Sequence, residues 1–264
     1  MRTLAIANQK GGVGKTTTAI NLGTALAATG KRVVIFDADP QGNASTGIDI
    51  SPDMRTVNAY HVLVGQAAIA GAVLPTKVPN LFLVPGDANL SGLETELMAV
   101  TRPQYRLRDA IAAHAHSTGQ GDGFDYMLID CPPSLNILTV NALTAADGVL
   151  VPLQCEFFAL EGLKQLMDTI GAVKVNLNPT LEIQGVVLTM HDARTNLSDQ
   201  VANDVRSVLG DKVYETIIPR NVRLSEAPSH GLPAIVYDQN ASGSKAYIAL
   251  AKELIERERT LMAA

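Results

Sequence analysis

Tryptophan is absent from this sequence, aromatic residues are few, and the 264 residues include only 2 cysteines, Cys131 and Cys155. Two cysteines are too few for a secreted scaffold held together by disulfides. The N-terminal segment also lacks the apolar run and the small-residue cleavage pattern of a secretory leader. We therefore expect a cytoplasmic protein whose two thiols are reduced and buried as small apolar side chains.

Long hydrophobic runs are missing as well. A membrane-spanning helix needs about 18 or more apolar residues in a row. The richest segment, residues 62–74, is interrupted by Gly65, Gln66 and Gly71. With 47% hydrophobic and 18% charged residues, the chain nevertheless supports a sizeable core and is not a disordered protein.

The chain has no excess of basic charge. Lysine and arginine total 21 against 26 aspartate and glutamate residues, which gives a net charge of −5. Because binding to nucleic acid depends strongly on the attraction between cations and phosphates, such binding requires a local basic patch or an assembled surface. Composition therefore excludes secreted, fibrous and membrane-spanning proteins but does not identify a function.

Short β-branched runs alternate along the chain with longer amphipathic segments. This alternation predicts a doubly wound, mostly parallel sheet with right-handed crossovers and helices on both faces, in a single domain over residues 1–264. The expected strands are residues 3–8, 32–37, 81–84, 126–130, 148–152, 185–189 and 213–218. The expected helices are residues 16–28, 107–116, 136–146, 161–175, 197–209 and 244–262, with a surface loop at residues 119–123.

The strongest chemical signal is a glycine-rich turn between the first strand and the first helix, residues 10–17 (KGGVGKTT). Glycines allow consecutive backbone N–H groups to turn inward, and these amides combine with the positive end of a helix dipole to bind phosphate. Lys15 would reach the β- and γ-phosphates, Thr16 would ligate Mg²⁺, and Thr17 would help to hold the α-phosphate. The backbone of the loop would surround the nucleotide at Gly11, Gly12, Val13 and Gly14.

This turn departs from the usual phosphate-loop pattern at one point. Gln9 occupies the position of the first glycine in G-x-x-x-x-G-K-[ST], and Lys10 adds a second cation at the start of the loop. A glycine-rich turn without a ligand is the alternative interpretation, but the full string in a strand-to-helix context argues against it.

Aspartates stand at the ends of two expected strands, where ligands bind in open α/β sheets. Asp130 ends one strand and would hold Mg²⁺ through its water shell. Asp39 follows the second strand and would orient the attacking water, while Asp37 would support the metal or the loop geometry. For each aspartate the alternative is a role in capping a helix.

These motifs resemble a known family. The string KGGVGKTTTAINL is similar to the deviant Walker A loop of the ParA/MinD group of P-loop ATPases. Four further strings, in the same order, resemble Soj-type ParA partition ATPases, and the likeness runs from about residue 3 to about residue 255. They are residues 36–43 (FDADPQGN), 128–134 (LIDCPPS), 188–194 (LTMHDAR) and 219–229 (PRNVRLSEAPS).

The resemblance implies an Mg²⁺-dependent ATPase that converts ATP to ADP and phosphate with Lys10, Lys15 and Asp39 as catalytic residues. In ParA-like proteins the lysine at the position of Lys10 reaches across a two-fold interface to the phosphates in the partner subunit, so that ATP is sandwiched in a homodimer. Hydrolysis then releases the dimer.

The resemblance also places the nucleotide base. Pro219 and Asn221 are expected to line the adenine, with Met190 at its border. An ordinary turn between a strand and a loop is the alternative interpretation of the same residues.

ParA proteins bind double-stranded DNA without sequence preference when they hold ATP, and are associated with the nucleoid. By resemblance, Arg194 and Arg223 are the best candidates for DNA contacts, with Arg206 and Lys245 behind them. Arginines that are merely solvated or paired are the alternative. The implied protein partner is a ParB/Spo0J-type centromere-binding protein whose basic N-terminus stimulates hydrolysis.

Alternatives remain within the same group of proteins. A positioning ATPase for a protein or organelle cargo would carry the same nucleotide site, and a scaffold with an inactive site would have lost it. A MinD-like membrane-associated division regulator needs a basic amphipathic tail, whereas residues 256–264 (ERERTLMAA) alternate basic and acidic residues. The phosphate loop begins at Lys10, so we expect no N-terminal helix-turn-helix extension. The two cysteines lack metal-ligand spacing, unlike those of the related nitrogenase iron protein.

Overall fold

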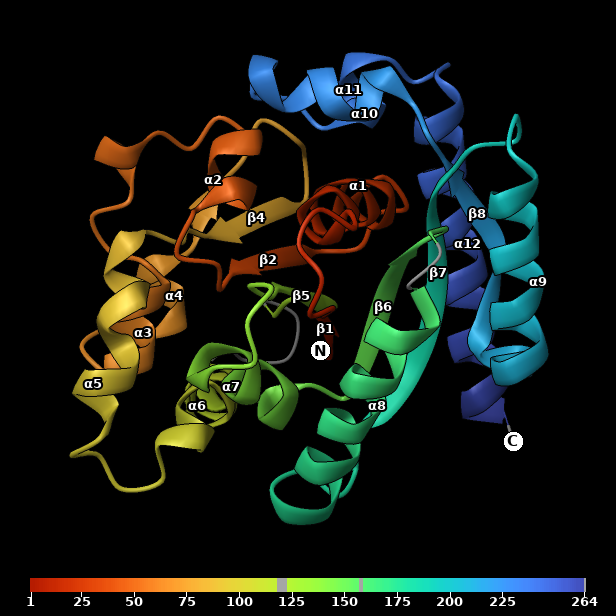
Figure 1. Cartoon of the computed structure of the whole chain (residues 1–264). Helices are drawn as coiled ribbons and strands as arrows, with labels where there is room; N and C mark the ends of the chain where they lie inside the picture. The colour runs from red at the N-terminus through yellow and green to blue at the C-terminus, as the bar shows by residue number, and fades with distance from the viewer. Residues whose placement is uncertain (118–122, 157–158, 264) are drawn as a thin grey trace.

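The centre of the computed structural model, which describes residues 1–117, 123–156 and 159–263, is one twisted sheet (Figure 1). Among these residues it has eight strands in the order β3-β4-β2-β5-β1-β6-β7-β8, all parallel except that β3 is antiparallel to β4. The strands are β1 (Arg2–Ile6), β2 (Val33–Asp37), β3 (Leu74–Pro75), β4 (Leu81–Val84), β5 (Tyr126–Asp130), β6 (Gly148–Gln154), β7 (Glu182–His191) and β8 (Val213–Pro219). The predicted doubly wound, mostly parallel sheet is confirmed.

Helices connect the strands and cover both faces of the sheet. The long ones are α1 (Lys15–Ala27), α6 (Arg106–Ser117), α7 (Ile137–Ala145), α8 (Ala159–Asn176), α9 (Asn196–Leu209) and α12 (Ser242–Ala263). Each lies within two residues of its predicted bounds. The short ones are α2 (Asn43–Gly47), α3 (Ala59–Val64), α4 (Ile69–Ala72), α5 (Leu93–Leu97), α10 (Val222–Glu226) and α11 (Ala234–Tyr237).

The short helices escaped prediction because four to six residues are too few to show a helical period. The predicted strand at residues 185–189 is longer than expected, since β7 runs from Glu182 to His191. The predicted loop at residues 119–123 lies, except for Gly123, outside the described residues. Within the described part of the chain, no helix has both the length and the apolar character needed to cross a membrane.

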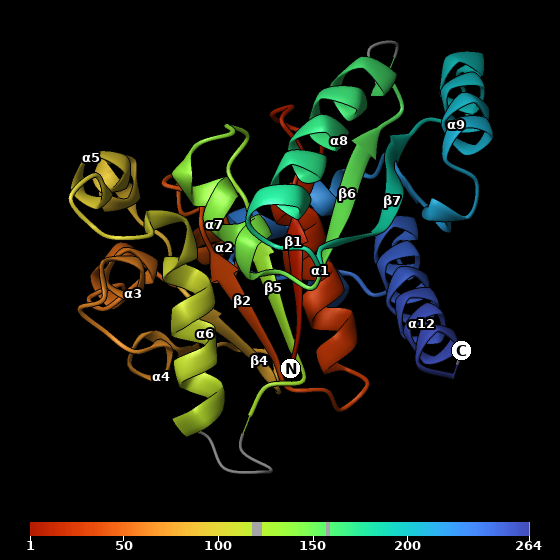
Figure 2. The ribbon, with the colours of Figure 1, turned by 90° about the horizontal axis from the view of Figure 1, so that it is seen from below.

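Side chains alternate between the two faces of the central strands, so each face has its own core. Leu4 and Ile6 of β1 belong to the core beneath α1 and α12, whereas Ala5 between them belongs to the core beneath α7 and α8. Figure 2 shows α8 and α12 on opposite sides of β6 and β7. Cys131 and Cys155 are buried free thiols, as predicted.

The register of the sheet brings together the residues of the candidate nucleotide-binding site. Asp130, the last residue of β5, is paired with Ile6 at the end of β1 on one side and with Asp37 at the end of β2 on the other. The glycine-rich loop begins just after β1. Two carboxylates from distant parts of the sequence therefore lie next to the loop at the carboxyl edge of the sheet.

Candidate nucleotide-binding site

The glycine-rich loop has the backbone conformation that its glycines permit. Gly12 has a φ of 76° and Gly14, which caps the N-terminus of α1, a φ of 91°, both in the left-handed region that disfavours side chains. The Thr189 hydroxyl of β7 donates a 2.9 Å hydrogen bond to the Val13 carbonyl. The loop is thus held from the side by a strand that sequence spacing did not connect with it.

Lys15 begins α1 and is buried, with 7% of its surface exposed. Its Nζ donates a 3.0 Å hydrogen bond to the Lys10 carbonyl. Burial lowers the pKa of Lys15, while the nearby charges of Asp130, Cys131 and Asp39 oppose the change. The structure therefore places a desolvated cation under the loop, where an anion would be favoured.

The second lysine of the loop points elsewhere. The backbone N–H of Lys10 donates to Asn8 Oδ1 at 3.0 Å, and Asn8 Nδ2 donates to the Pro152 carbonyl of β6 at 2.7 Å. The Lys10 ammonium, about half exposed, forms an ion pair with Glu156, two residues beyond β6. Lys10 is therefore fixed at its backbone, with a side chain that is held by a surface carboxylate.

Asp130 is fully buried, and neither of its carboxylate oxygens has a hydrogen-bond partner among the described residues. Burial, and then the neighbouring charge of Asp37, raise the pKa of Asp130 well above its usual range, although the nearby Thr16 hydroxyl and the charge of Lys15 oppose the change. An unpaired buried carboxylate is costly, so it calls for a cation or for water. The helical capping alternative for Asp130 has no support in these contacts.

These residues fit Mg²⁺, which prefers oxygen ligands and keeps several of its waters. Asp130 and the hydroxyl of Thr16, the second residue of α1, would supply the protein ligands. Within the described residues, no three Asp, Glu, His or Cys side chains converge into a metal site of their own. Such an ion would therefore depend on the phosphates of a nucleotide to complete its coordination.

Asp37 plays a structural part in this arrangement. Its fully buried carboxylate accepts hydrogen bonds from the Ser45 hydroxyl at 2.6 Å, the Ser45 N–H at 2.9 Å and the Asp39 N–H at 3.3 Å. Burial raises the pKa of Asp37 to about 6, although the Ser45 hydrogen bonds oppose the change. The geometry supports the loop-geometry role that was expected for Asp37 as one alternative.

Asp39 lies two residues beyond Asp37, in the turn that follows β2. It is 8% exposed, and its Oδ1 accepts a 2.9 Å hydrogen bond from the Gln41 N–H. Its charge is one of those that oppose the lowering of the Lys15 pKa. Asp39 follows the end of β2, where Asp37 is paired with Asp130, at the edge of the sheet from which the phosphate loop also begins.

A cavity of about 430 Å³ adjoins the phosphate loop. Gly14 and Thr17 line it on the loop side, and Met190, Pro219 and Asn221 line it from the ends of β7 and β8. The structure therefore brings together the residues that were expected to surround the adenine. Met190 has a φ of 51°, a strained conformation of the kind that gathers at functional sites.

Asn221 also has a structural role. Its Oδ1 accepts a 3.0 Å hydrogen bond from the Arg223 N–H and so caps α10, while its Nδ2 donates to Ser242 Oγ at 2.8 Å. These bonds are those expected of an ordinary turn, and they fix the cavity wall at the same time.

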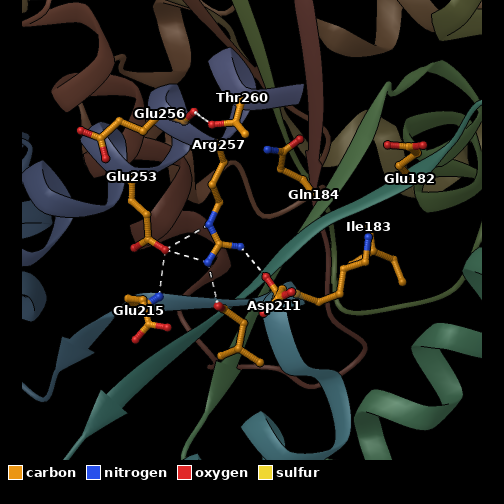
Figure 3. Close-up of a pocket in the computed structure, with 11 residues that line it drawn as sticks. Glu182, Ile183, Gln184, Asp211, Glu215, Glu253, Glu256, Arg257 and Thr260 are labelled. Carbon is orange, nitrogen blue, oxygen red and sulfur yellow. Dashed lines mark hydrogen bonds and ion pairs between the residues drawn. The ribbon is translucent and has the colours of Figure 1, made fainter. Parts of the chain in front are cut away.

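A larger cavity, about 600 Å³, lies at the opposite end of the sheet between the amino ends of β7 and β8 and the last turns of α12 (Figure 3). Arg257 crosses it and donates to Glu253 and to the carbonyls of Asp211 and Val213. The carboxylates of Glu182, Glu215 and Glu256, which also line this cavity, stand apart from one another in Figure 3. This cavity has no phosphate loop and no converging ligand set.

Comparison with known proteins agrees with the geometry at the phosphate loop. A family model described as an AAA domain matches residues 1–183. The chain is 62% identical over 259 residues to the chromosome partitioning protein ParA of Caulobacter vibrioides, covering 98% of this chain and 96% of that protein. It is 50% identical over 253 residues to the sporulation initiation inhibitor protein Soj of Bacillus subtilis, with coverage of 96% and 98%. The chain belongs to the ParA/Soj family.

A solved structure extends this comparison to ligands. The crystal structure of cobyrinic acid a,c-diamide synthase from Mycobacterium smegmatis with bound ADP and magnesium is similar to this chain, with a TM-score of 0.84 and 37% sequence identity. The likeness covers 98% of this chain and 96% of that one. The loop, Lys15 and Asp130 of this ParA/Soj family member are suited to the same two ligands.

The two arginines expected to contact DNA are engaged in ion pairs in this ParA/Soj family member. Arg194, whose side chain is 84% exposed, makes a bidentate pair with Asp192 at 2.8 and 2.7 Å. Arg223 pairs with Glu226 at 2.7 Å. Both pairs are local in sequence and both arginines are exposed, so the pairs contribute little stability and are easily exchanged. Arg223 Nε also lies 3.6 Å from Asp238 Oδ2.

The weaker candidates divide. Arg206 donates to the carbonyls of Tyr214 and Glu215, so its guanidinium serves the fold. Lys245, in the first turn of α12, is exposed. Arg220 was predicted only as part of the base segment, but it lines the smaller cavity with an exposed side chain. No sequence pattern distinguishes Arg220 from its neighbours.

Proposed function

We propose that this protein is a chromosome-partitioning ATPase that alternates between an ATP-bound dimer on DNA and a released monomer. The observation that carries the proposal is the buried pair of Lys15 and an unpartnered Asp130 at a phosphate loop. It stands in a chain that is 62% and 50% identical, over nearly its whole length, to a chromosome partitioning protein and to Soj. The likeness to the diamide synthase, at 37% identity, is weaker.

Hydrolysis would use residues already in place. Lys15 and the loop amides stabilise the charge on the transferring phosphoryl group, and Asp39 accepts a hydrogen bond from the attacking water. Thr16 and Asp130 hold Mg²⁺, which when bound neutralises charge on the phosphates. The products are ADP and inorganic phosphate.

Dimerisation would depend on Lys10. In this proposal the Lys10 ammonium leaves Glu156 and reaches the phosphates of a nucleotide held by the partner subunit, in the manner of an arginine finger supplied in trans. A polyphosphate carries more charge than one carboxylate and so wins the competition for this lysine. A Lys10→Ala variant should bind ATP as a monomer but neither dimerise nor hydrolyse ATP efficiently; normal dimerisation would contradict the role.

DNA binding would follow from the dimer. Arg194 and Arg223 exchange Asp192 and Glu226 for DNA phosphates, and two subunits double the number of contacts. A chain with a net charge of −5 then holds non-specific double-stranded DNA in the nucleoid only in its ATP state. A ParB-type centromere-binding protein would stimulate hydrolysis and release the dimer.

The decisive experiment is binding to random-sequence duplex DNA at two salt concentrations. The wild type is tested with ADP, and an Asp39→Ala variant is tested with ATP so that hydrolysis is blocked. We expect binding only with ATP, weakened steeply by salt. A double variant, Arg194→Ala with Arg223→Ala, should bind ATP normally and lose most of the DNA affinity, whereas Arg206→Ala should show little specific effect.

The related alternatives give different outcomes in the same assay. ATP-dependent dimerisation without DNA binding would favour a positioning ATPase for a protein or organelle cargo. Co-sedimentation with anionic liposomes in the ATP state would favour a MinD-like membrane regulator. ATP binding without turnover, with or without DNA, would leave a scaffold with an inactive site.

A further inference from the structure

A buried arginine stands behind the loop that carries Asp39. Arg55 is 8% exposed and forms no ion pair with a carboxylate among the described residues. Its guanidinium donates to the Ile50 carbonyl at 3.1 and 2.7 Å, to the Gly86 carbonyl at 3.1 Å and to the Thr46 hydroxyl at 2.8 Å. Burying an unpaired guanidinium is costly, and here all its bonds go to segments that surround the candidate site.

The first of these segments is the turn that follows Asp39. Gly42 has a φ of 60°, and its N–H donates to the Asp39 carbonyl at 2.9 Å. A Cβ at Gly42 would overlap the Arg55 guanidinium and would lie 2.8 Å from the Gly86 carbonyl oxygen. Thr46, which Arg55 also binds, donates back to the Gly42 carbonyl at 3.1 Å. Arg55 therefore packs against Gly42 at the end of this turn and bonds the threonine whose hydroxyl returns to the Gly42 carbonyl.

The second segment follows β4 and touches the aspartates from the other side. A Cβ at Gly86 would lie 2.6 Å from the Asp37 carbonyl oxygen and 2.9 Å from the Asp39 carbonyl oxygen. The Gly86 N–H donates to Ser45 Oγ at 3.0 Å, and this hydroxyl donates to Asp37. The backbone around both aspartates is thus packed against Gly86, whose carbonyl is bonded to Arg55.

We propose that Arg55 is a positioning residue for ATP hydrolysis, which keeps the Asp39 loop closed on Gly86 so that the Asp39 carboxylate holds its place at the carboxyl edge of the sheet. The role rests on the proposed ATPase function. Arg55 acts through the turn and is not among the residues that line the base cavity. A planar, forked guanidinium can hold three acceptors at once, whereas a lysine ammonium on a flexible stem cannot reproduce that geometry.

The chain offers a matched control. Arg106 donates through Nε to the Leu63 carbonyl at 2.8 Å and packs on Gly65, a glycine with a φ of 81°. A Cβ at Gly65 would overlap its guanidinium, as one at Gly42 would overlap that of Arg55. The two arginines therefore clamp similar turns, but only the clamp at Arg55 borders the aspartates of the site.

The test compares Arg55→Lys with Arg106→Lys in steady-state ATPase assays and in binding of a non-hydrolysable ATP analogue. We expect Arg55→Lys to lower kcat by about 10- to 100-fold, with KM and analogue affinity within about twofold of wild type. Arg106→Lys should leave kcat within about twofold, even where its thermal stability falls equally. An unchanged kcat in Arg55→Lys overturns the proposal, and so does a parallel loss of analogue binding.

A milder variant covers the case in which Arg55→Lys does not fold. Thr46→Val, at an exposed position, removes one acceptor of Arg55 together with the hydroxyl that donates to the Gly42 carbonyl. It should lower kcat by about three- to tenfold with KM unchanged, and an unchanged kcat again overturns the role of the clamp. Failure of the proposed function is distinguishable, because a wild type that binds ATP without turning it over rejects the ATPase itself.

Discussion

The cavity beside the phosphate loop and the cavity at the amino ends of β7 and β8 differ in how their charged groups are satisfied. In the larger one, of about 600 Å³, Arg257 is bonded to Glu253 and to two backbone carbonyls. Beside the smaller one, of about 430 Å³, Lys15 is buried without an ion pair and Asp130 has no hydrogen-bond partner among the described residues.

This difference indicates that buried charged groups without a partner, and not the volume of a cavity, mark the candidate functional site. Glu253 in the larger cavity also accepts the N–H groups of Glu215 and Thr216 at 2.8 and 2.9 Å. That network ties α12 to β8 and leaves its central groups without need of a ligand. Lys15 and Asp130, by contrast, are placed where a phosphate and a divalent cation would complete them.

The comparison breaks most visibly at Lys15. Lys15→Met removes the buried cation of the loop, so we expect affinity for an ATP analogue to fall by about 100-fold or more. Lys212→Met makes the same change at the rim of the larger cavity and should leave the affinity within about twofold. Titration calorimetry measures both. Equal affinities for the two variants would mean that the phosphate loop is not the nucleotide site.

A second variant tests whether Asp130 requires a bound cation. Asp130→Asn keeps the shape of the side chain but removes the charge that we propose holds Mg²⁺, so kcat should fall by about 100-fold or more and ATP binding should lose its Mg²⁺ dependence. Measurement of turnover and of analogue binding with Mg²⁺ and with EDTA gives both quantities. A variant whose turnover still responds to Mg²⁺ as the wild type does would remove Asp130 from the metal site.

The raised pKa of Asp130 predicts that the stability of the folded chain depends on pH, and Asp130→Asn tests this. Folding raises the pKa of Asp130 above its ordinary 3.8, so the folded chain binds this proton more tightly than the unfolded chain. The resulting stability is fully present below pH 3.8 and is lost as the pH rises. The pKa of Asp37 is raised to about 6, so Asp37 also contributes stability that is lost as the pH rises from 3.8 to about 6. Urea unfolding without nucleotide should show wild-type stability falling from pH 5 to 8, and a smaller fall in Asp130→Asn.

The larger cavity should respond in stability and not in catalysis. Arg257→Met removes the guanidinium that donates to Glu253 and to the Asp211 and Val213 carbonyls, so we expect the free energy of unfolding to fall by about 2–4 kcal/mol. KM and kcat of the folded variant should stay within about twofold of wild type. Chemical denaturation and ATPase assays at a temperature well below the transition separate the two effects. Selective loss of activity would assign this cavity a function.

The smallest effect is expected at Lys10. Glu156→Gln removes the carboxylate that holds this lysine, and an exposed ion pair is worth about 1 kcal/mol or less. Dimerisation with a non-hydrolysable ATP analogue should therefore tighten by only about two- to fivefold, and less at high salt. Sedimentation velocity measures it, with Glu161→Gln as the control on α8. Weaker dimerisation would place Glu156 in the interface itself.

Local sequence was sufficient for the parts of the site that lie within one strand-loop-helix unit. The glycines of residues 10–17 and the position of Lys15 at the start of α1 follow from backbone sterics over a few residues. The apolar strands that end in Asp37 and Asp130 also predicted the sheet, because parallel strands bring their carboxyl ends to one edge.

Contacts between distant segments were beyond such reasoning. The support of the loop by Thr189, the use of Asp37 as an acceptor for Ser45, and the clamp at Arg55 join residues that no periodicity relates. The ion pairs of Arg194 with Asp192 and of Arg223 with Glu226 are local in sequence, but they depend on how short turns place these carboxylates.

The sequence by itself therefore determined the phosphate loop, the doubly wound sheet and the family, because each is carried by local conformation or by motifs in order. Only the tertiary structure decided which charged groups have a partner within the protein and which are buried without one. The physical reason is that hydrogen bonding and desolvation are set by whatever segment packs against a group. Asp130 lies beside Asp37 of another strand, and Arg55 bonds the carbonyl of Gly86, and no local pattern relates either pair.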